Sequence, residues 1–314
     1  MRLCSSSRLL LVSFLIGGPN FLHAQEAPAN LPTAQRLPVA SASDQHLIPL
    51  SVLVTDGTGR AIPSLTKDNF SVTEDGQRQA ILNVWRNDAP CSIGILLDLS
   101  GSMEKHLPQE RAAVLQFLRA SNPNDEFFLL TFSDHADLLV DFTSSQDQIA
   151  AKLDNLQIGH RTALYDALSE ALGKLRQASR PRRVLLVISD GNDNVGHHSD
   201  AEIRTEFRKL QVQMNGIAFD DSRASVEEQS GLHSFTQLTT DSGGRFLLLD
   251  DPTQAGVAGA AMAAGLRLGY VLSYSSTNRK ADGQWRKVKV KVSPPPGIGH
   301  LSIYAPNEYY APLQ

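Results

Sequence analysis

The chain has 314 residues, a formal net charge of −4 and a hydrophobic fraction of 41%. This length is enough for about two globular domains, and the hydrophobic fraction is ordinary for such proteins. The mildly acidic balance excludes a general nucleic-acid binder, which needs a basic surface. Only two cysteines are present, Cys4 and Cys91, so a fold held together by several disulfides is also excluded.

The first 24 residues have the pattern of a secretory signal peptide. Arg2 and Arg8 precede an apolar run at 9–16, and Ala24 is a small residue at a suitable cleavage point. The apolar run is shorter than the roughly 20 residues that a membrane-spanning helix needs. We therefore predict that residues 1–24 are removed and that the mature chain has no membrane span. The protein is then expected to be secreted, periplasmic or part of the cell envelope.

The segment 25–45 is rich in Ala, Pro and Ser and has no hydrophobic periodicity, which predicts a flexible linker. The segment 46–88 then contains three runs with the composition of β-strands, at 47–54, 69–74 and 79–85. Asp-Gly pairs separate these runs and are strong turn signals. No helical pattern occurs here, so this segment is predicted to be all-β.

From residue 89 to 268 the pattern changes to strands that alternate with helices, which is typical of parallel βαβ units. Six runs have the apolar content of strands in a buried sheet, at 93–97, 127–132, 136–142, 184–188, 212–219 and 245–249. The second and third runs are close enough to form a hairpin, so one edge of the sheet is expected to be antiparallel. The polar stretch 220–231 is predicted to be a long surface loop before a short helix.

Oxygen-bearing side chains follow two of the buried strands and precede one helix. The three loops carry two carboxylates and three hydroxyls, which belong to Asp98, Ser100, Ser102, Thr162 and Asp190. The carboxyl ends of parallel strands meet at one edge of a sheet, where ligand sites form in α/β proteins. Hard oxygen donors in this ratio suit Mg²⁺, which takes about six oxygen ligands. The alternative is an ordinary strand-to-helix turn in which the hydroxyls cap the helix.

The tail 269–314 returns to strand patterns, with runs at 269–275, 285–292 and 301–304. Neither this tail nor the segment 46–88 is large enough for a stable core of its own, because chains of about 40 residues seldom fold without help. We therefore predict that the two segments form one small all-β sandwich, and that the α/β domain at 89–268 is inserted into it.

The five oxygen-bearing residues resemble the metal-ion-dependent adhesion site (MIDAS) of von Willebrand factor type A (VWA) domains. The family pattern is Asp-x-Ser-x-Ser, a distant Thr, and a distant Asp in a Ser-Asp-Gly context, and all three parts occur here in order. The pentapeptide alone recurs by chance, whereas the full set is specific. The resemblance implies a doubly wound, Rossmann-like, mostly parallel six-stranded sheet. With its flanking β segments, the layout is similar to the secreted bacterial proteins grouped as VWFA-related.

The resemblance also implies binding and not catalysis. A Mg²⁺ ion, with Mn²⁺ or Ca²⁺ as alternatives, would bridge the site to an Asp or Glu carboxylate of a partner protein. Arg161 and Asp193 lie beside the site residues and are candidates for contact with that partner. Arg161 could instead be a solvated loop arginine, and Asp193 could orient its loop.

Two other functions remain open, a metal-dependent hydrolase and a purely structural envelope scaffold. A hydrolase is disfavoured because no second carboxylate adjoins Asp98, no lysine lies in the site loops, and no glycine-rich phosphate cradle is present. The intact set of metal ligands argues against a scaffold. We therefore expect a binding protein and not an enzyme.

Overall fold

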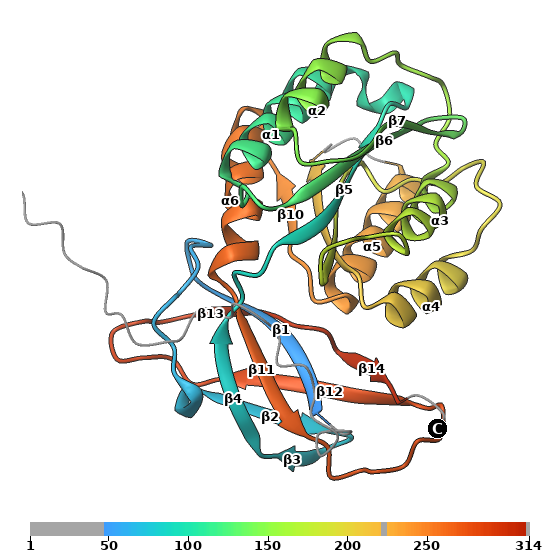
Figure 1. The fold of residues 1–314 in the computed structure, drawn as a ribbon. Coiled ribbons are helices and arrows are strands. Elements are labelled where there is room, and N and C mark those ends of the chain that lie inside the picture. Colours follow the sequence, from blue (N-terminus) through green and yellow to red (C-terminus); the bar gives the residue numbers. More distant parts are fainter. Residues whose placement is uncertain (1–46, 221–224, 312–314) are drawn as a thin grey trace, which may run out of the picture. The chain divides into compact units, whose positions relative to one another are not determined.

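The computed structural model describes residues 47–220 and 225–311 (Figure 1). The predicted signal peptide at 1–24, the whole of the predicted linker at 25–45 and the first residue of the β segment at 46–88 lie outside the described residues. None of the helices in the described ranges is both long enough and apolar enough to cross a membrane. The division of the chain into domains stays a prediction.

A six-stranded sheet forms the centre of the α/β part, in the order β10-β9-β8-β5-β6-β7. Every neighbouring pair is parallel except β6 and β7, which are antiparallel. The strands are β5 (Cys91–Asp98), β6 (Glu126–Phe132), β7 (Ala136–Thr143), β8 (Arg182–Ile188), β9 (Gln213–Phe219) and β10 (Phe246–Leu249). The predicted fold class, with its antiparallel edge, is confirmed.

Helices cover both faces of this sheet (Figure 1). The helices are α1 (Leu107–Ala120), α2 (Gln146–Lys152), α3 (Leu164–Leu175), α4 (Asp200–Leu210), α5 (Val226–Asp241) and α6 (Ala255–Leu268). Short 3₁₀ turns are η1 (Lys67–Asn69), η2 (Gly101–His106), η3 (Leu153–Asn155) and η4 (Pro252–Gln254). One apolar cluster contains residues of α1, α2 and α6, and the other contains residues of α3, α4 and α5. The sheet is therefore doubly wound.

Strand β5 lies at the centre of the sheet, and all eight of its residues are buried. Gly94, the one residue that interrupts its apolar run, has a packing reason. A Cβ atom at Gly94 would lie 2.3 Å from the ring of Phe128 and 2.6 Å from the side chain of Leu185. Close approach of the neighbouring strands' side chains therefore requires glycine there.

Helix α5 corrects one expectation. The stretch 220–231 was expected to be a loop, but α5 already begins at Val226. Ser225 and Glu228 form a capping box, in which each side chain accepts a hydrogen bond from the other's backbone N–H. The first turns of α5 are largely polar and exposed, so they lack the apolar periodicity that marks a helix, and the helix is anchored further along by the buried Phe235.

Eight further strands form two four-stranded antiparallel sheets. The first has the order β13-β1-β11-β4 and comprises β1 (Leu47–Asp56), β4 (Ile81–Arg86), β11 (Tyr270–Ser275) and β13 (Leu301–Tyr304). The second has the order β14-β12-β2-β3 and comprises β2 (Phe70–Glu74), β3 (Gln77–Gln79), β12 (Trp285–Val292) and β14 (Glu308–Tyr310). Each sheet takes strands from before and after the α/β part, and one apolar cluster joins them, as predicted.

A buried carboxylate links the two sheets. Glu74 on β2 is 1% exposed and accepts hydrogen bonds from the hydroxyls of Tyr274 (2.8 Å), Ser276 (2.6 Å) and Tyr309 (3.0 Å). A buried charge is tolerated when its oxygens are hydrogen-bonded in this way. The contact joins strands that are about 200 residues apart in the sequence, so it ties the amino-terminal segment to the tail.

Helix α6 packs closely against α1. A Cβ atom at Gly259 would lie 2.0 Å from the backbone oxygen of Ala113, a distance at which the two helices must move apart. We predict that Gly259→Ala lowers the free energy of unfolding by about 1–3 kcal/mol, as overpacking usually does. The control is Gly173→Ala in α3, where the added Cβ meets nothing within 4 Å. That change should stabilise the protein by up to about 1 kcal/mol, because alanine is the better helix former.

Urea unfolding of both variants beside the wild type makes the comparison. Equal stability of the two variants would show that α1 and α6 are not held at the observed distance.

Candidate metal centre

Three loops meet at the carboxyl edge of the six-stranded sheet. Asp98 ends β5, and Asp190 follows β8, which pairs with β5 in parallel. The loop that carries Thr162 is joined to the first loop by a hydrogen bond from the backbone N–H of Gly159 to the oxygen of Leu99, at 2.7 Å. The topology of the sheet therefore brings the three predicted parts of the site to one edge.

Four of the five predicted ligands form one chain of hydrogen bonds. The backbone N–H of Ser100 donates to Oδ1 of Asp98 at 3.0 Å. The hydroxyls of Ser100 and Ser102 are 3.1 Å apart, and Ser102 donates to Oδ2 of Asp190 at 2.6 Å. The side-chain oxygens of Ser100, Ser102 and Asp190 therefore follow one another at hydrogen-bond distance, and Asp98 joins them through the backbone of Ser100.

Thr162 is held in place through its backbone. Its N–H donates to Oδ1 of Asn194 at 2.9 Å, and its carbonyl oxygen accepts from the N–H of Asn194 at 2.9 Å. The residue is 3% exposed. Among the described residues, no hydrogen bond joins the Thr162 hydroxyl to the other four predicted ligands.

The inner and outer ends of the site differ in their access to solvent. Asp98 and Ser100 are 0% and 1% exposed, whereas Ser102 is exposed and Asp190 is partly exposed. Anything that approaches the site from outside therefore meets the side of Ser102 and Asp190 first. The inner carboxylate is shielded from water.

Among the described residues, no basic side chain pairs with the two carboxylates of the site. Burial raises the pKa of Asp98 from its usual 3.8 to about 7, and the negative charge of Asp190 adds to the rise. Hydrogen bonds from Ser189 and Ser100 act in the opposite direction. Within the described ranges, no lysine, arginine or histidine forms an ion pair with Asp98 or Asp190. A divalent cation would supply the missing positive charge, so the residues present fit a metal ion.

The donor types indicate which metals suit the site. In the described part of the chain, no three His, Cys, Asp or Glu side chains converge on one metal position. The available donors are therefore two carboxylates with neutral hydroxyls, which suit Mg²⁺, Mn²⁺ or Ca²⁺ better than metals that prefer imidazole or thiolate. The side chain of His197 is 88% exposed and contacts Asp166 at 2.8 Å, so this histidine pairs with a residue outside the five predicted ligands.

Two residues that support the site were not predicted from the sequence. Ser189 donates to Oδ2 of Asp98 at 2.6 Å, and Asn194 holds Thr162. Ser189 lies in the Ser-Asp-Gly context of the motif, so the motif itself was a signal for it. Asn194 had none, because its contact crosses between loops that are 32 positions apart.

The two residues predicted to contact a partner have different surroundings. Arg161 is exposed and makes no ion pair within the described ranges. Asp193 accepts a hydrogen bond from the backbone N–H of Tyr165 at 3.4 Å, in the first turn of α3. Helix α3 has no cap from its own preceding side chain, so Asp193 provides an acceptor from another loop. Contact of either residue with a partner stays a prediction.

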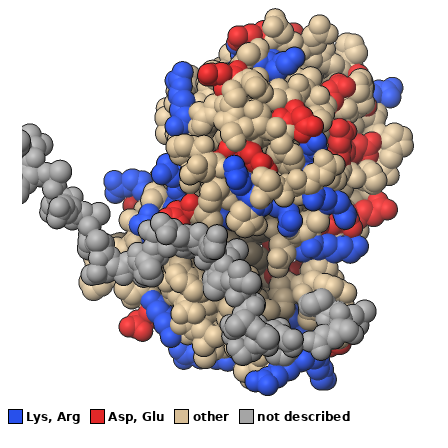
Figure 2. Space-filling model, viewed as in Figure 1, with Lys and Arg blue, Asp and Glu red and all other residues tan. Residues whose placement is uncertain are grey.

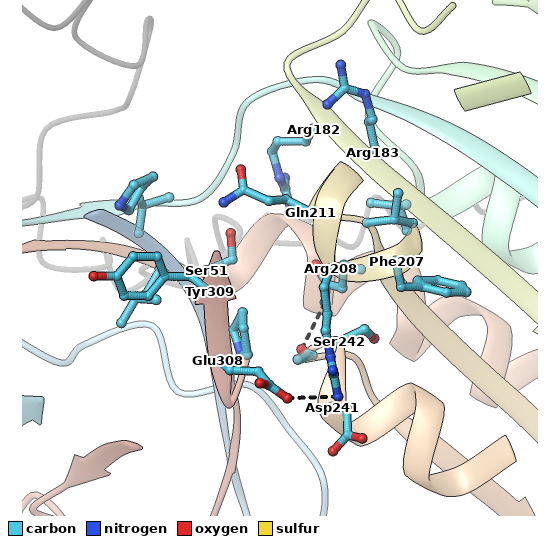
Figure 3. A pocket seen from close by; sticks show the side chains of 18 of the residues that line it. Ser51, Arg182, Arg183, Phe207, Arg208, Gln211, Asp241, Ser242, Glu308 and Tyr309 are labelled. Carbon is cyan, nitrogen blue, oxygen red and sulfur yellow. Dashed lines mark hydrogen bonds and ion pairs between the residues drawn. The ribbon is translucent and has the colours of Figure 1, made fainter. Parts of the chain in front are cut away.

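A separate cavity of about 200 Å³ is lined by residues of β1, α4 and β14, among others, and by none of the five predicted ligands (Figure 3). Two arginines that line it form ion pairs, Arg208 with Glu308 at 2.8 Å (Figure 3) and Arg204 with Asp241 at 2.5 Å. Arg182 and Arg183 form no ion pair within the described residues and donate hydrogen bonds to backbone oxygens. On the face shown in Figure 2, acidic and basic side chains are interspersed, so charge of one sign does not dominate it.

Comparisons with known proteins identify the type of the α/β domain. The family model of the von Willebrand factor type A domain matches residues 93–192. Inter-alpha-trypsin inhibitor heavy chain H4 from Bos taurus is 24% identical over 159 residues, which are 45% of this chain and 17% of that protein. The chain thus spans about a sixth of that relative's length.

A solved structure that covers most of this chain shares its fold. The von Willebrand factor type A structure from Catenulispora acidiphila has a TM-score of 0.51 at 10% identity and covers 87% of this chain and 75% of its own. Proximal thread matrix protein 1 from the mussel byssus, with a zinc-occupied MIDAS motif, has a TM-score of 0.46 at 19% identity, over 60% of this chain and 48% of its own. The family match shows that residues 93–192 belong to a von Willebrand factor type A domain, and the described α/β part has the fold of such domains.

Proposed function

We propose that this protein is a divalent-metal-dependent, adhesion-type protein-binding module. Its metal, Mg²⁺ in the first instance, is held by Asp98, Ser100, Ser102, Thr162 and Asp190. The ligand is an Asp or Glu carboxylate presented by a partner protein. The observation that carries the proposal is the pair of neighbouring carboxylates, one fully buried, with no cation from the described protein to balance them.

The donor set explains why an outside carboxylate would be attracted. Three of the five proposed ligands are neutral hydroxyls, which donate less charge than carboxylates do. A dication held by this set keeps positive charge for a further oxygen ligand, which is the chemistry that the metal supplies. The exposed position of Ser102 leaves that direction open to a partner, while the buried Asp98 anchors the inner side.

Binding is favoured over the two alternatives. The family to which the domain belongs consists generally of protein-interaction modules. Hydrolysis would need a general base or a second metal beside the first, and no three acidic or histidine groups converge within the described residues. A scaffold function would give no role to the buried carboxylate of Asp98 and the partly exposed carboxylate of Asp190. The proposed location, outside the cytoplasm or in the cell envelope, rests on the amino-terminal sequence pattern.

The first prediction concerns metal uptake. Calorimetric titration with Mg²⁺ should show one site in the wild type and no measurable uptake by Asp98→Ala, because the central carboxylate is lost. Asp68→Ala removes an exposed carboxylate on η1 and serves as the matched control, which should bind Mg²⁺ as the wild type does. Equal uptake by all three proteins would contradict the proposed ligands.

The second prediction concerns the stability of the metal-free protein. Because the pKa of Asp98 is higher in the folded state than its usual value, the folded state binds more protons between about pH 4 and 7. Stability in EDTA should therefore fall as the pH rises through this window, by up to about 1.4 kcal/mol per pH unit, and level off above pH 7. Asp98→Asn removes this contribution.

The measurement is urea unfolding in EDTA at several pH values. Above pH 7, Asp98→Asn should be more stable than the wild type without metal, yet gain nothing from added Mg²⁺. If the free energy of unfolding of the two proteins changed equally with pH, the pKa of Asp98 would not be raised in the folded state.

The third prediction tests the partner. Immobilised protein should capture a partner from an envelope extract in Mg²⁺ and release it in EDTA, and Asp190→Ala should capture none. Changing one acidic residue of that partner to its amide should abolish binding, since the amide offers the metal no charge. A partner whose binding survives both EDTA and Asp190→Ala would refute the metal bridge.

A further inference from the structure

Helix α1 carries a buried acidic side chain that is not one of the five predicted metal ligands. Glu110 lies in the first turn of α1 and is 0% exposed. Within the ranges 47–220 and 225–311, neither of its carboxyl oxygens has a hydrogen-bond partner. A buried carboxyl group without any partner is rare, because its desolvation costs several kcal/mol and nothing in the protein offsets that cost.

The start of α1 lies at the same edge of the sheet as the metal centre. The site loop continues directly from Ser102 through η2 into α1. Within η2, the ring of His106 stacks on that of Phe219, the last residue of β9, with ring centres 4.3 Å apart. This contact fixes the first turn of α1 over the carboxyl ends of the strands.

Glu110 is also electrostatically coupled to the site. Burial raises the pKa of Glu110 well above the usual 4.5, and the negative charges of Asp98 and Asp190 add to the rise. Three acidic groups therefore share one region. None of them forms an ion pair with a basic side chain within the described residues.

Glu110 is not placed to be a direct ligand together with the other two acids, because no three such groups converge on one metal position in the described part. An apolar side chain would suit its surroundings better, since its helix neighbours Ala113 and Val114 belong to the apolar cluster under α1. Burial of the Glu110 carboxyl group therefore costs free energy of desolvation, and no hydrogen bond among the described residues offsets it.

We propose that Glu110 is a positioning residue of the metal centre, which acts on the cation through an intervening water and adds a third negative charge to the site. This inference rests on the proposed metal binding by Asp98 and Asp190. The bound cation gives the buried carboxylate its missing counter-charge, and the water gives it a hydrogen-bond donor. Groups that orient a metal's ligands from behind in this way typically contribute about 10–100-fold to metal affinity.

The test compares Glu110→Gln with the wild type and with Glu104→Gln. Glu104 lies on η2 close to the site but is exposed, so its change to Gln removes the same charge without touching the buried pocket. Mg²⁺ affinity is measured by calorimetry, and melting temperature is measured in EDTA and in Mg²⁺. Glu110→Leu is included as a second variant, because leucine suits the apolar cluster and safeguards folding.

The two Glu110 variants should bind Mg²⁺ about 10–100-fold more weakly than the wild type. In EDTA they should melt at the same temperature as the wild type or above it, because a buried carboxyl group without a hydrogen-bond partner among the described residues has been replaced. Mg²⁺ should raise their melting temperature less than it raises that of the wild type. Glu104→Gln should match the wild type in both measurements.

If either folded Glu110 variant bound Mg²⁺ as tightly as the wild type, the inference would be wrong and the proposed metal site would stand. Glu110 would then be a buried, protonated residue without an effect on the metal. No Mg²⁺ uptake by the wild type would overturn both the inference and the proposed function.

Discussion

The parallel pairing of β5 with β8 is the constraint on which the rest of the site depends. It fixes the carboxyl ends of two central strands next to each other, and each of those ends delivers an aspartate. Burial raises the pKa of Asp98 to about 7, and the negative charge of Asp190 adds to the rise. A divalent cation bound at this edge would stabilise both carboxylates in their charged form. The arrangement of the strands therefore favours the metal binding that we propose.

The remaining elements hold this arrangement rigid. Strand β5 is buried along its whole length, and close packing at Gly94 leaves little room for the central strands to shift. Hydrogen bonds between loops, from Gly159 to Leu99 and between Thr162 and Asn194, link the three site segments to one another. A preorganised set of oxygens loses little entropy when it binds a cation or a partner, which is what a binding site on loops requires.

Much of this architecture could be predicted from the sequence because its signals are local. Apolar runs ended by polar turns gave the six strands of the central sheet, and the spaced motif gave the candidate ligands. The start of α5 was missed because its first turns are polar and its capping box needs no apolar residue. Short strands such as β3 and β14 carry too few residues for a periodic pattern. Contacts between distant segments, such as Asn194 with Thr162 or the burial of Glu110, leave no trace in local sequence at all.

The central proposal is that one divalent cation binds at the edge of the sheet, between the ends of β5 and β8. Anomalous diffraction from crystals of the protein grown with Mn²⁺ would locate that cation directly, because Mn²⁺ scatters anomalously and takes the same oxygen ligands as Mg²⁺. We expect a single strong anomalous peak within ligand distance of the side-chain oxygens, or of waters bound to them, of the five proposed ligands Asp98, Ser100, Ser102, Thr162 and Asp190. A well-ordered site without a peak, or with the peak elsewhere, would contradict it.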